Sequence, residues 1–186
     1  FKEEISEGKL VLLNEDILTF AINKTWQNVY EGTLGRSDGS GQRKFSPGNF
    51  RGESGNILPG FVSYKIIANI PYNITGAILK KFLTEENQPE RMILMVQHEV
   101  AKRIVARDKK ESILSISVKA YGEPKLVMKV PARYFSPAPK VDSAVIAINN
   151  ISRKLLRENN IPEEKFWEIV RASFAHKRKK LSSNLK

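Results

Sequence analysis

The four residues Asn69-Ile70-Pro71-Tyr72 are the strongest candidates for chemistry in this sequence. The side-chain amide oxygen of Asn69 and the backbone carbonyl of Ile70 could accept hydrogen bonds from the two hydrogens of an exocyclic amino group. Such bonds would draw the nitrogen toward tetrahedral geometry and aim its lone pair at a methyl donor. Pro71 fixes the backbone and offers no competing N–H, and Tyr72 offers an aromatic face to a flipped-out base. The pattern predicts methyl transfer to a base.

An ordinary turn is the alternative for these four residues, because Asn-x-Pro also occurs in turns. The position in the chain favours a site. Residues 64–68 are predicted to form a buried strand directly before the motif, and a helix with Thr75 as its N-cap is predicted after it. Ligands of α/β sheets bind at the carboxyl ends of strands. From these residues alone, the turn and the site remain open.

The elements around the motif indicate an α/β fold. Residues 10–13 and 92–96 are predicted to be buried strands, and residues 99–107 a helix. Strands that alternate with helices are typical of parallel βαβ units, hence of a doubly wound α/β sheet. Residues 112–120 fit a strand or a helix. Further predictions are strands at 125–130 and 143–148, a proline-rich loop at 131–141, and a last helix with Pro162 as its first residue and an apolar stripe of Phe166, Ile169, Val170, Ser173 and Phe174.

Composition excludes several kinds of site. The 186 residues contain no cysteine and two histidines, so disulfides, thiol nucleophiles and multi-histidine metal sites are not expected, and we predict no metal. No apolar run approaches the roughly 18 residues of a membrane span, so no membrane association is expected. A hydrophobic content of 41% is sufficient for a packed core.

The net charge of +11 lies entirely in the second half of the chain. Residues 1–93 carry 11 basic and 11 acidic side chains, whereas residues 94–186 carry 20 basic and 9 acidic ones. This asymmetry favours a surface that binds a polyanion, although a basic surface can also serve solubility. Residues 25–61 differ again, because they hold 8 of the 11 glycines, and we predict a flexible insertion there.

Four segments occur in an order that resembles one family. NIPYNIT, VQHEVAKRIVA, VPARYFSPAPKVDSAV and RASFAHKRKKLSSNL are similar to segments of the KsgA-type (RsmA) ribosomal RNA adenine dimethyltransferases. The resemblance implies a Rossmann-like methyltransferase domain that uses S-adenosylmethionine, followed by a small helical domain. It also implies N6,N6-dimethylation of two adjacent adenines near the 3′ end of small-subunit ribosomal RNA.

The resemblance also implies roles for individual residues. Asn69, Ile70, Pro71 and Tyr72 would form the catalytic motif, with Asn69 also facing the cofactor. Phe135 would pack on the other side of the target base, and Asp16 would bind the amino group of the cofactor's adenine. The residues expected to contact RNA are Lys140, Lys177, Arg178, Lys179 and Lys180. Each role has a structural alternative: Phe135 as a core aromatic, Asp16 as a helix cap or solvated strand end, and the basic run as the end of a helix.

The expected organisation is a partial catalytic domain over residues 1–150, with the insertion at 25–61, and the start of a helical RNA-contacting domain over residues 151–186. The family's glycine-rich cofactor loop and acidic ribose-binding residue are not found before residue 10. We therefore expect this chain by itself to bind S-adenosylmethionine weakly and to be inactive. The protein is expected to be a cytoplasmic monomer whose partner is the immature small ribosomal subunit. The alternatives are an Erm-type enzyme of the large subunit and a non-catalytic assembly factor that binds ribosomal RNA.

Overall fold

The computed structural model describes residues 2–6, 10–22, 63–106, 110–176 and 181–184. The chain divides into two compact units, residues 1–63 and residues 64–186, and each is described here by itself. The predicted insertion at residues 25–61 and the basic run at residues 177–180 lie outside the described residues. No helix within the described ranges is long and apolar enough to cross a membrane.

The first unit contains helix α1 (Lys2–Ser6) and the irregular residues 10–15. The prediction of a buried strand at residues 10–13 is wrong, because these side chains are exposed and no strand forms there. Leu12 is 80% exposed. A strand needs a partner for its backbone groups, and the described residues of this unit provide no strand for it to pair with. The apolar residues 10–13 are therefore not sufficient to form a strand without a neighbouring strand.

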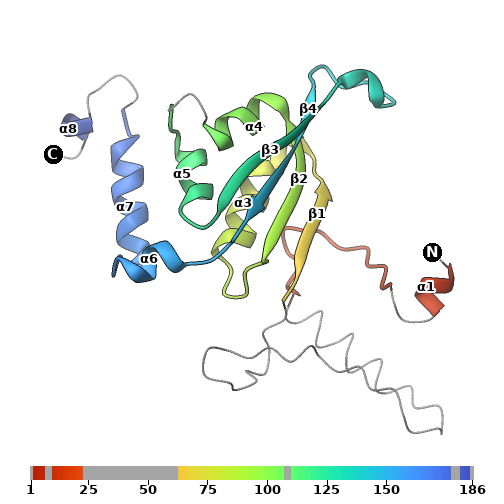
Figure 1. The fold of residues 1–186 in the computed structure, drawn as a ribbon, viewed down its shortest axis with the longest axis horizontal. Coiled ribbons are helices and arrows are strands. Elements are labelled where there is room, and N and C mark those ends of the chain that lie inside the picture. The colour runs from red at the N-terminus through yellow and green to blue at the C-terminus, as the bar shows by residue number, and fades with distance from the viewer. Residues whose placement is uncertain (1, 7–9, 23–62, 107–109, 177–180, 185–186) are drawn as a thin grey trace, which may run out of the picture. The chain divides into compact units, whose positions relative to one another are not determined.

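The second unit is built on a sheet of four strands in the order β1-β2-β4-β3 (Figure 1). The strands are β1 (Lys65–Asn69), β2 (Arg91–Gln97), β3 (Glu123–Val130) and β4 (Ser143–Asn149). The strands predicted at 64–68, 92–96, 125–130 and 143–148 are thus confirmed, with ends that differ by one or two residues. Only β1 and β2 are parallel, since β4 runs antiparallel to both of its neighbours. The described sheet is mixed, whereas the alternation of elements had indicated a parallel one.

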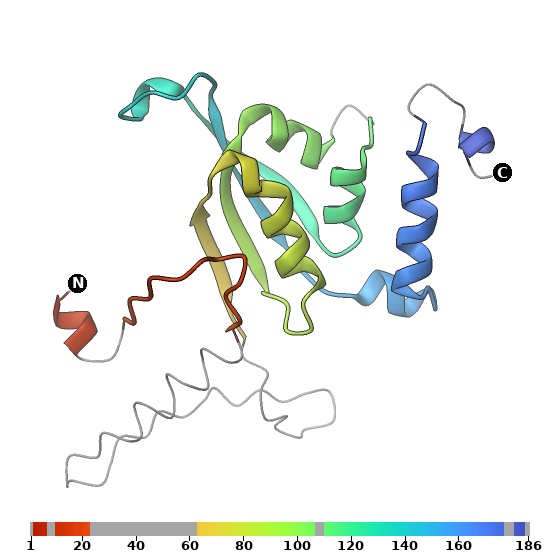
Figure 2. The same ribbon diagram turned by 180° about the vertical axis from the view of Figure 1, so that it is seen from behind.

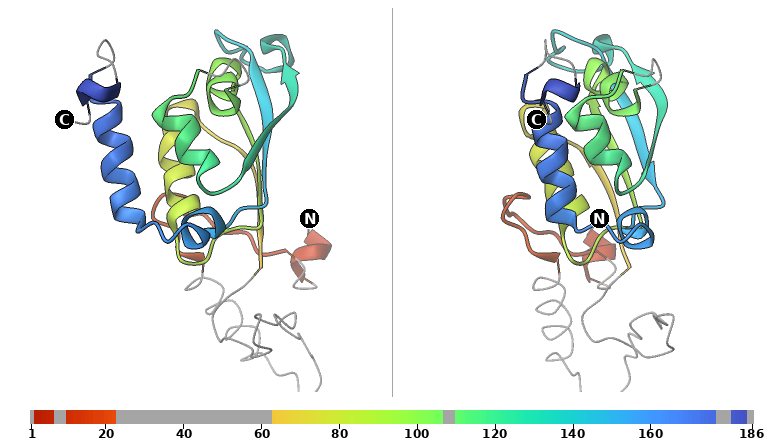
Figure 3. Two further views of the ribbon diagram at one scale, coloured as in Figure 1. Left: turned by 60° about the vertical axis from the view of Figure 1, so that its left-hand side comes forward. Right: turned by 90° about the vertical axis from the view of Figure 1, so that its left-hand side faces the viewer.

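Three helices cover one face of this sheet: α3 (Thr75–Thr84), α4 (His98–Val105) and α5 (Ile113–Lys119), as Figures 1 and 3 show. Side chains alternate between the faces of a strand, so every second residue points toward the helices. On β2 and β4 these residues are completely buried: Met92, Leu94, Val96, Ala144, Ile146 and Ile148. Helix α3 adds Ile78, Leu79, Phe82 and Leu83, which helical periodicity places on one side. These residues form the core of the unit.

In Figure 2 the helices lie in front of the sheet, whereas the opposite face, which is toward the viewer in Figure 1, carries no helix of this unit within the described residues. On β1 this face presents Ile67, which is 79% exposed. The prediction that residues 64–68 form a buried strand is therefore wrong for one of its two faces. A continuous apolar run indicates a strand covered on both sides, and in this unit the cover is on one side.

The ambiguous segment at residues 112–120 forms helix α5, and two serines explain its start. The backbone N–H of Ser115 donates to Oγ of Ser112 at 3.2 Å, and the backbone N–H of Ser112 donates to Oγ of Ser115 at 2.7 Å. This reciprocal capping box satisfies two N–H groups that a helix start leaves free. The alternation of apolar residues in this segment had suggested a strand equally well.

The described part of the unit contains three further α-helices: α6 (Lys154–Glu158), which the sequence did not predict, α7 (Glu163–Ser173) and α8 (Leu181–Asn184). Pro162 is the N-cap of α7 rather than its first residue. In the predicted stripe of α7, Val170 is buried and Phe166 packs on the core, while Ile169 is largely exposed. Trp167 also packs on the core, although the sequence analysis did not select it.

Candidate active site

The motif lies at the carboxyl end of β1, as predicted. Asn69 is the last residue of this strand, and its side chain is exposed. Ile70 is buried in the core, so its main chain is held close to the sheet. Tyr72 is half-buried and begins the short 3-10 helix η1 (Tyr72–Ile74), which leads into α3. The parallel neighbour β2 ends at Gln97 on the same edge of the sheet.

Two hydrogen bonds to backbone carbonyls hold the segment after Asn69. Pro71 holds a φ of −57° and a ψ of 135°, and its carbonyl accepts from the N–H of Ile74 at 3.2 Å. The buried hydroxyl of Thr75 donates to the carbonyl of Tyr72 at 3.1 Å. The prediction of Thr75 as an N-cap is wrong, because Thr75 is the first residue of α3 and Ile74 occupies the cap position. The threonine hydroxyl binds the turn before the helix instead.

The hydroxyl of Tyr72 connects the segment after β1 to strand β4. Its Oη lies 2.7 Å from Oγ of Ser143, the first residue of β4. Ser143 pairs with Gln97 at the end of β2 and with Val130 at the end of β3. The sequence analysis did not select Ser143. Its only signal was its place in the PKVDSAV segment, directly after the proline-rich loop.

Phe135 lies in the loop that joins β3 to β4, after the short 3-10 helix η2 (Ala132–Tyr134). This loop leaves the sheet at Val130 and returns at Ser143, so it projects from the edge where β1 and β2 end. Phe135 is half-buried, and its N–H donates to the carbonyl of Ala132 at 3.1 Å. The structure thus brings Phe135 and Tyr72 to one edge. Their roles on either side of a base stay predictions.

Asp142 fixes this loop to the sheet. Its Oδ1 accepts from the N–H of Ala132 at 2.9 Å, and its Oδ2 lies 2.7 Å from Nζ of Lys129. Its main-chain carbonyl accepts from the N–H of His98, the first residue of α4, at 2.9 Å. The hydrogen bond from Lys129 and that from the Ala132 N–H hold the pKa of the Asp142 carboxyl below its ordinary value.

Asp16 lies in the first unit, so the structure does not place it relative to Asn69. Its Oδ1 accepts from the N–H of Leu18 at 2.9 Å, and the side chain is exposed. Its main-chain carbonyl accepts from the N–H of Phe20, also at 2.9 Å, which closes a turn. Cofactor binding by Asp16 stays a prediction. The described residues contain no group of three or more histidine, aspartate or glutamate side chains that could hold a metal ion.

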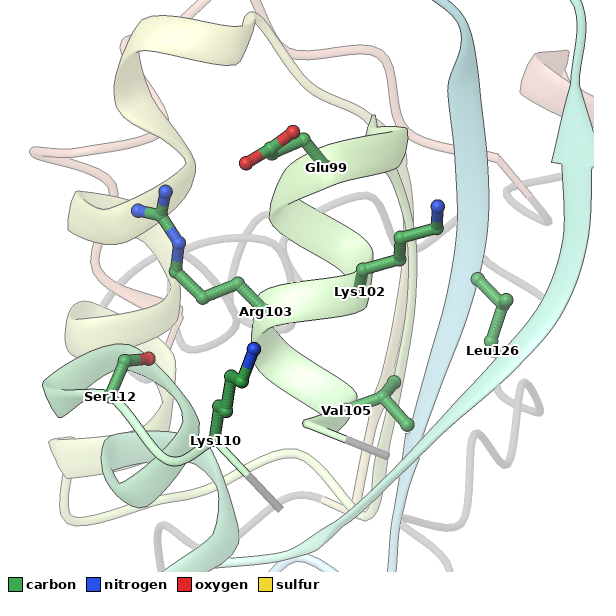
Figure 4. A pocket seen from close by; sticks show the side chains of 7 residues that line it. All are labelled: Glu99, Lys102, Arg103, Val105, Lys110, Ser112 and Leu126. Carbon is green, nitrogen blue, oxygen red and sulfur yellow. The ribbon is translucent and has the colours of Figure 1, made fainter. Parts of the chain in front are cut away.

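Two grooves with lysine side chains in their lining flank helix α4. A groove of about 390 Å³ is lined by Gln97, His98, Glu99, Lys102, Lys140, Val141 and Asp142. A second groove of about 630 Å³ is lined by Glu99, Lys102, Arg103, Val105, Lys110, Ser112 and Leu126 (Figure 4). In Figure 4 the side chains of Arg103 and Lys110 extend toward the same space, and Lys102 points to the other side of the helix. Lys140 was predicted to contact RNA, whereas Lys102, Arg103 and Lys110 were not.

The helical periodicity of α4 explains why Lys102 and Arg103 face the grooves. Ala101 and Ile104 are completely buried, which turns the intervening Lys102 and Arg103 toward solvent. Their exposure therefore follows from the packing of the helix on the sheet.

Known proteins are similar to this chain in sequence and in fold. The family model described as "Ribosomal RNA adenine dimethylase" matches residues 1–186. A "Ribosomal RNA small subunit methyltransferase A" of Dehalococcoides mccartyi strain CBDB1 is 44% identical over 129 residues, which are 69% of this chain and 44% of that protein. The protein with the same name from Geobacillus thermodenitrificans is 43% identical over 122 residues, which are 64% of this chain and 41% of that protein. The chain therefore spans less than half the length of these relatives.

Two solved structures are similar in fold. A dimethyladenosine transferase from Plasmodium falciparum matches with a TM-score of 0.57 and 28% identity, over 69% of this chain and 46% of that one. The 23S rRNA methyltransferase ErmE matches with a TM-score of 0.55 and 26% identity, over 71% of this chain and 52% of that one. With a family model that covers its whole length and relatives above 40% identity, this chain belongs to the ribosomal RNA adenine dimethylase family.

Proposed function

We propose that this chain carries the acceptor side of an active site that dimethylates N6 of two adjacent adenines near the 3′ end of small-subunit ribosomal RNA. The observation that supports this most is the position of Asn69 and Ile70. An exposed side-chain amide and a backbone anchored in the core follow each other at the carboxyl end of a parallel strand. The names of the bacterial relatives favour the small subunit.

Adenine N6 is a weak nucleophile because its lone pair is delocalised into the ring. In the proposed mechanism Oδ1 of Asn69 and the carbonyl of Ile70 each accept one N6 hydrogen bond, which makes the nitrogen more tetrahedral. Acceptors held in place before the reaction act without reorganisation, and the burial of Ile70 provides this rigidity. Tyr72 stacks on the base, a contact worth about 1–3 kcal/mol. The methylated amine then loses its proton to water, so no general base is required.

S-adenosylmethionine, which the family implies, supplies the methyl group when bound. The residues described here fit part of such a site. Asn69 is exposed at a strand end, where α/β sheets bind ligands. Asp16 uses Oδ1 for the Leu18 N–H, and its exposed carboxylate can accept a further hydrogen bond from an amino group.

We also propose that the two grooves beside α4 bind the RNA backbone. Lys102 lines both of them, with Lys140 across the smaller groove and Arg103 and Lys110 in the larger one. Lysine and arginine on one surface attract phosphates without reading sequence, which suits a substrate recognised largely by its shape. The smaller groove also includes Gln97, the last residue of β2, so it begins at the edge that carries the motif.

The experiment is transfer of labelled methyl groups from S-adenosylmethionine, with the protein in the full length that its gene encodes. We expect label in the RNA of immature small subunits, and expect Asn69→Ala to slow transfer by about 100-fold or more, as for loss of one preorganised polar group. RNA affinity should stay within about twofold. Asn73→Ala is the matched control, because Asn73 is an exposed asparagine in the same turn.

Three results would contradict the proposal. Label on large-subunit RNA would favour an enzyme of the Erm type, which the structural match to ErmE keeps as the second candidate. Binding to small subunits without any transfer would indicate a non-catalytic assembly factor. Full activity of Asn69→Ala would remove Asn69 from the role of N6 acceptor.

A further inference from the structure

The hydrogen bond between Tyr72 and Ser143 crosses the end of a strand. Tyr72 follows β1 and Ser143 begins β4, and β2 lies between these two strands. Neighbouring strands lie about 4.8 Å apart, so β1 and β4 run about 10 Å from each other. The hydroxyl of Tyr72 lies 2.7 Å from that of Ser143, so the bond joins the segment after β1 to the start of β4, which is not the neighbouring strand of β1.

Ser143 is a fixed point for this bond. Its exposed fraction is 1%, so its hydroxyl has no alternative partner in bulk water. Its backbone is held on two sides, since Ser143 is paired with Gln97 of β2 and with Val130 of β3. A tyrosine ring has two rotatable side-chain bonds, and a hydrogen bond from its outer end to an immobile group restricts both.

We infer that Ser143 is a positioning residue that sets the orientation of the Tyr72 ring on which the target adenine stacks. This inference rests on the proposed function. Ser143 is buried and acts through Tyr72, so it need not touch the reacting atoms. The preceding residue, Asp142, binds the main chain of the loop that carries Phe135. The dipeptide Asp142-Ser143 thus connects both predicted base-stacking side chains to the same edge of the sheet.

The effect of losing this bond is expected on the chemical step. Without it the ring of Tyr72 can tilt, and the bound adenine is then held less often in the geometry for attack. Ser143 itself is not among the residues that line either groove, so contacts to phosphates should be unchanged and the KM for RNA should change less than twofold. Loss of one neutral hydrogen bond corresponds to a fall in kcat of roughly 3- to 10-fold.

The experiment is a double-mutant cycle of Ser143→Ala and Tyr72→Phe, measured as kcat and KM for methyl transfer by the full-length protein. Each variant removes one partner of the same bond. We expect each to lower kcat by a similar factor, and the double variant to be no slower than the slower single variant. Ser117→Ala is the matched control, because its hydroxyl donates to the carbonyl of Ile113 within the same helix, α5.

The outcomes separate this inference from the proposed function. If the wild-type protein transfers no methyl group, the proposed function is wrong. If it transfers and Ser143→Ala keeps the wild-type kcat, or the two losses multiply in the double variant, the role of Ser143 is overturned. Should Ser143→Ala fail to fold by circular dichroism, Tyr72→Phe decides alone: a wild-type kcat overturns the inference, and a selective fall in kcat supports it.

Discussion

Asp142 shows how one carboxylate holds the loop between β3 and β4. Through its side chain it binds the N–H of Ala132 and the ammonium group of Lys129, and through its carbonyl it binds the N–H of His98. The two side-chain partners stabilise the ionised form, and they lower the pKa of the carboxyl. A group whose pKa is lower in the folded state stabilises that state only when it is ionised.

The loop should therefore become less stable in acid. The contribution of Asp142 is complete above the ordinary aspartate pKa of about 3.9, and it is lost as the pH falls through the lower value of the folded state. Asp142→Asn removes the charge at every pH. We expect its urea midpoint to lie below that of the wild type near pH 7, and the two midpoints to converge as the pH falls below the ordinary aspartate pKa of about 3.9.

Glu158→Gln is the control for this experiment, because Glu158 is an exposed carboxylate in an i,i+4 pair with Lys154 and should contribute little at any pH. A difference between Asp142→Asn and the wild type that stayed constant from neutral to acid pH would show that the charge of Asp142 does not stabilise the loop.

At Gly122, which connects α5 to β3, the close contact with the end of β4 leaves no room for a side chain. A Cβ atom there would lie 2.9 Å from the carbonyl oxygen of Asn149 and 2.9 Å from Cγ2 of Ile148. Both neighbours are the last residues of β4, and the backbone there is paired with β3, so it cannot move away without breaking that pairing. The close approach of α5 to this end of the sheet therefore requires glycine.

Gly122→Ala should destabilise the unit by about 1–3 kcal/mol, the usual cost of overpacking. Gly76→Ala is the matched control, because a Cβ at Gly76 in α3 would meet nothing within 4 Å. Alanine favours helix over glycine by up to about 1 kcal/mol, so this control should be neutral or slightly stabilising. Urea unfolding of both variants is the measurement, and equal effects would show that close contact at Gly122 does not matter.

Within the second unit, a polar network joins Arg153 and helix α7 to the residues at the ends of α3 and α5. Nε1 of Trp167 donates to the hydroxyl of Tyr121 at 3.1 Å, and that hydroxyl donates to Glu163. Arg153 donates to Glu163 at 3.0 Å and to the carbonyl of Thr84 at 2.7 Å.

Burial, followed by the hydrogen bond to Glu163, raises the pKa of Tyr121, so its hydroxyl stays protonated and able to donate. The network and the buried Ile151 and Leu156 attach residues 151–173 firmly, while a domain boundary at residue 150 stays a prediction.

The lysines that line the two grooves beside α4 predict how RNA binding depends on salt. Each lysine that contacts a phosphate contributes about one released counterion, so Lys102→Gln and Lys140→Gln together should lower the slope of log K against log salt by about one to two. Lys165→Gln is the control, since Lys165 is an exposed lysine paired with Glu168 on α7. Fluorescence anisotropy with a small-subunit ribosomal RNA hairpin measures the slope. An unchanged slope in the double variant would show that these grooves are not the RNA-binding surface.

The sequence by itself determined the local features of this protein. The motif at Asn69, the strand before it and the helix after it follow from residue types and spacing within a few positions, and the structure has all three. The four segments of the resemblance also sufficed for the family, which the comparisons confirm. The charge asymmetry predicted a basic surface without locating it, because net charge does not say which side chains face the same way.

Tertiary structure decided whatever depends on a partner distant in the chain. The apolar residues 10–13 are not a strand, because hydrophobicity does not supply a neighbouring strand. Residues 112–120 are a helix, because a capping box at Ser112 and packing on the sheet outweigh their alternation. Ser143 meets Tyr72, 71 positions away, only because the strand order β1-β2-β4 brings their ends to one edge. Local patterns do not encode strand order, so that contact could be found only in the folded molecule.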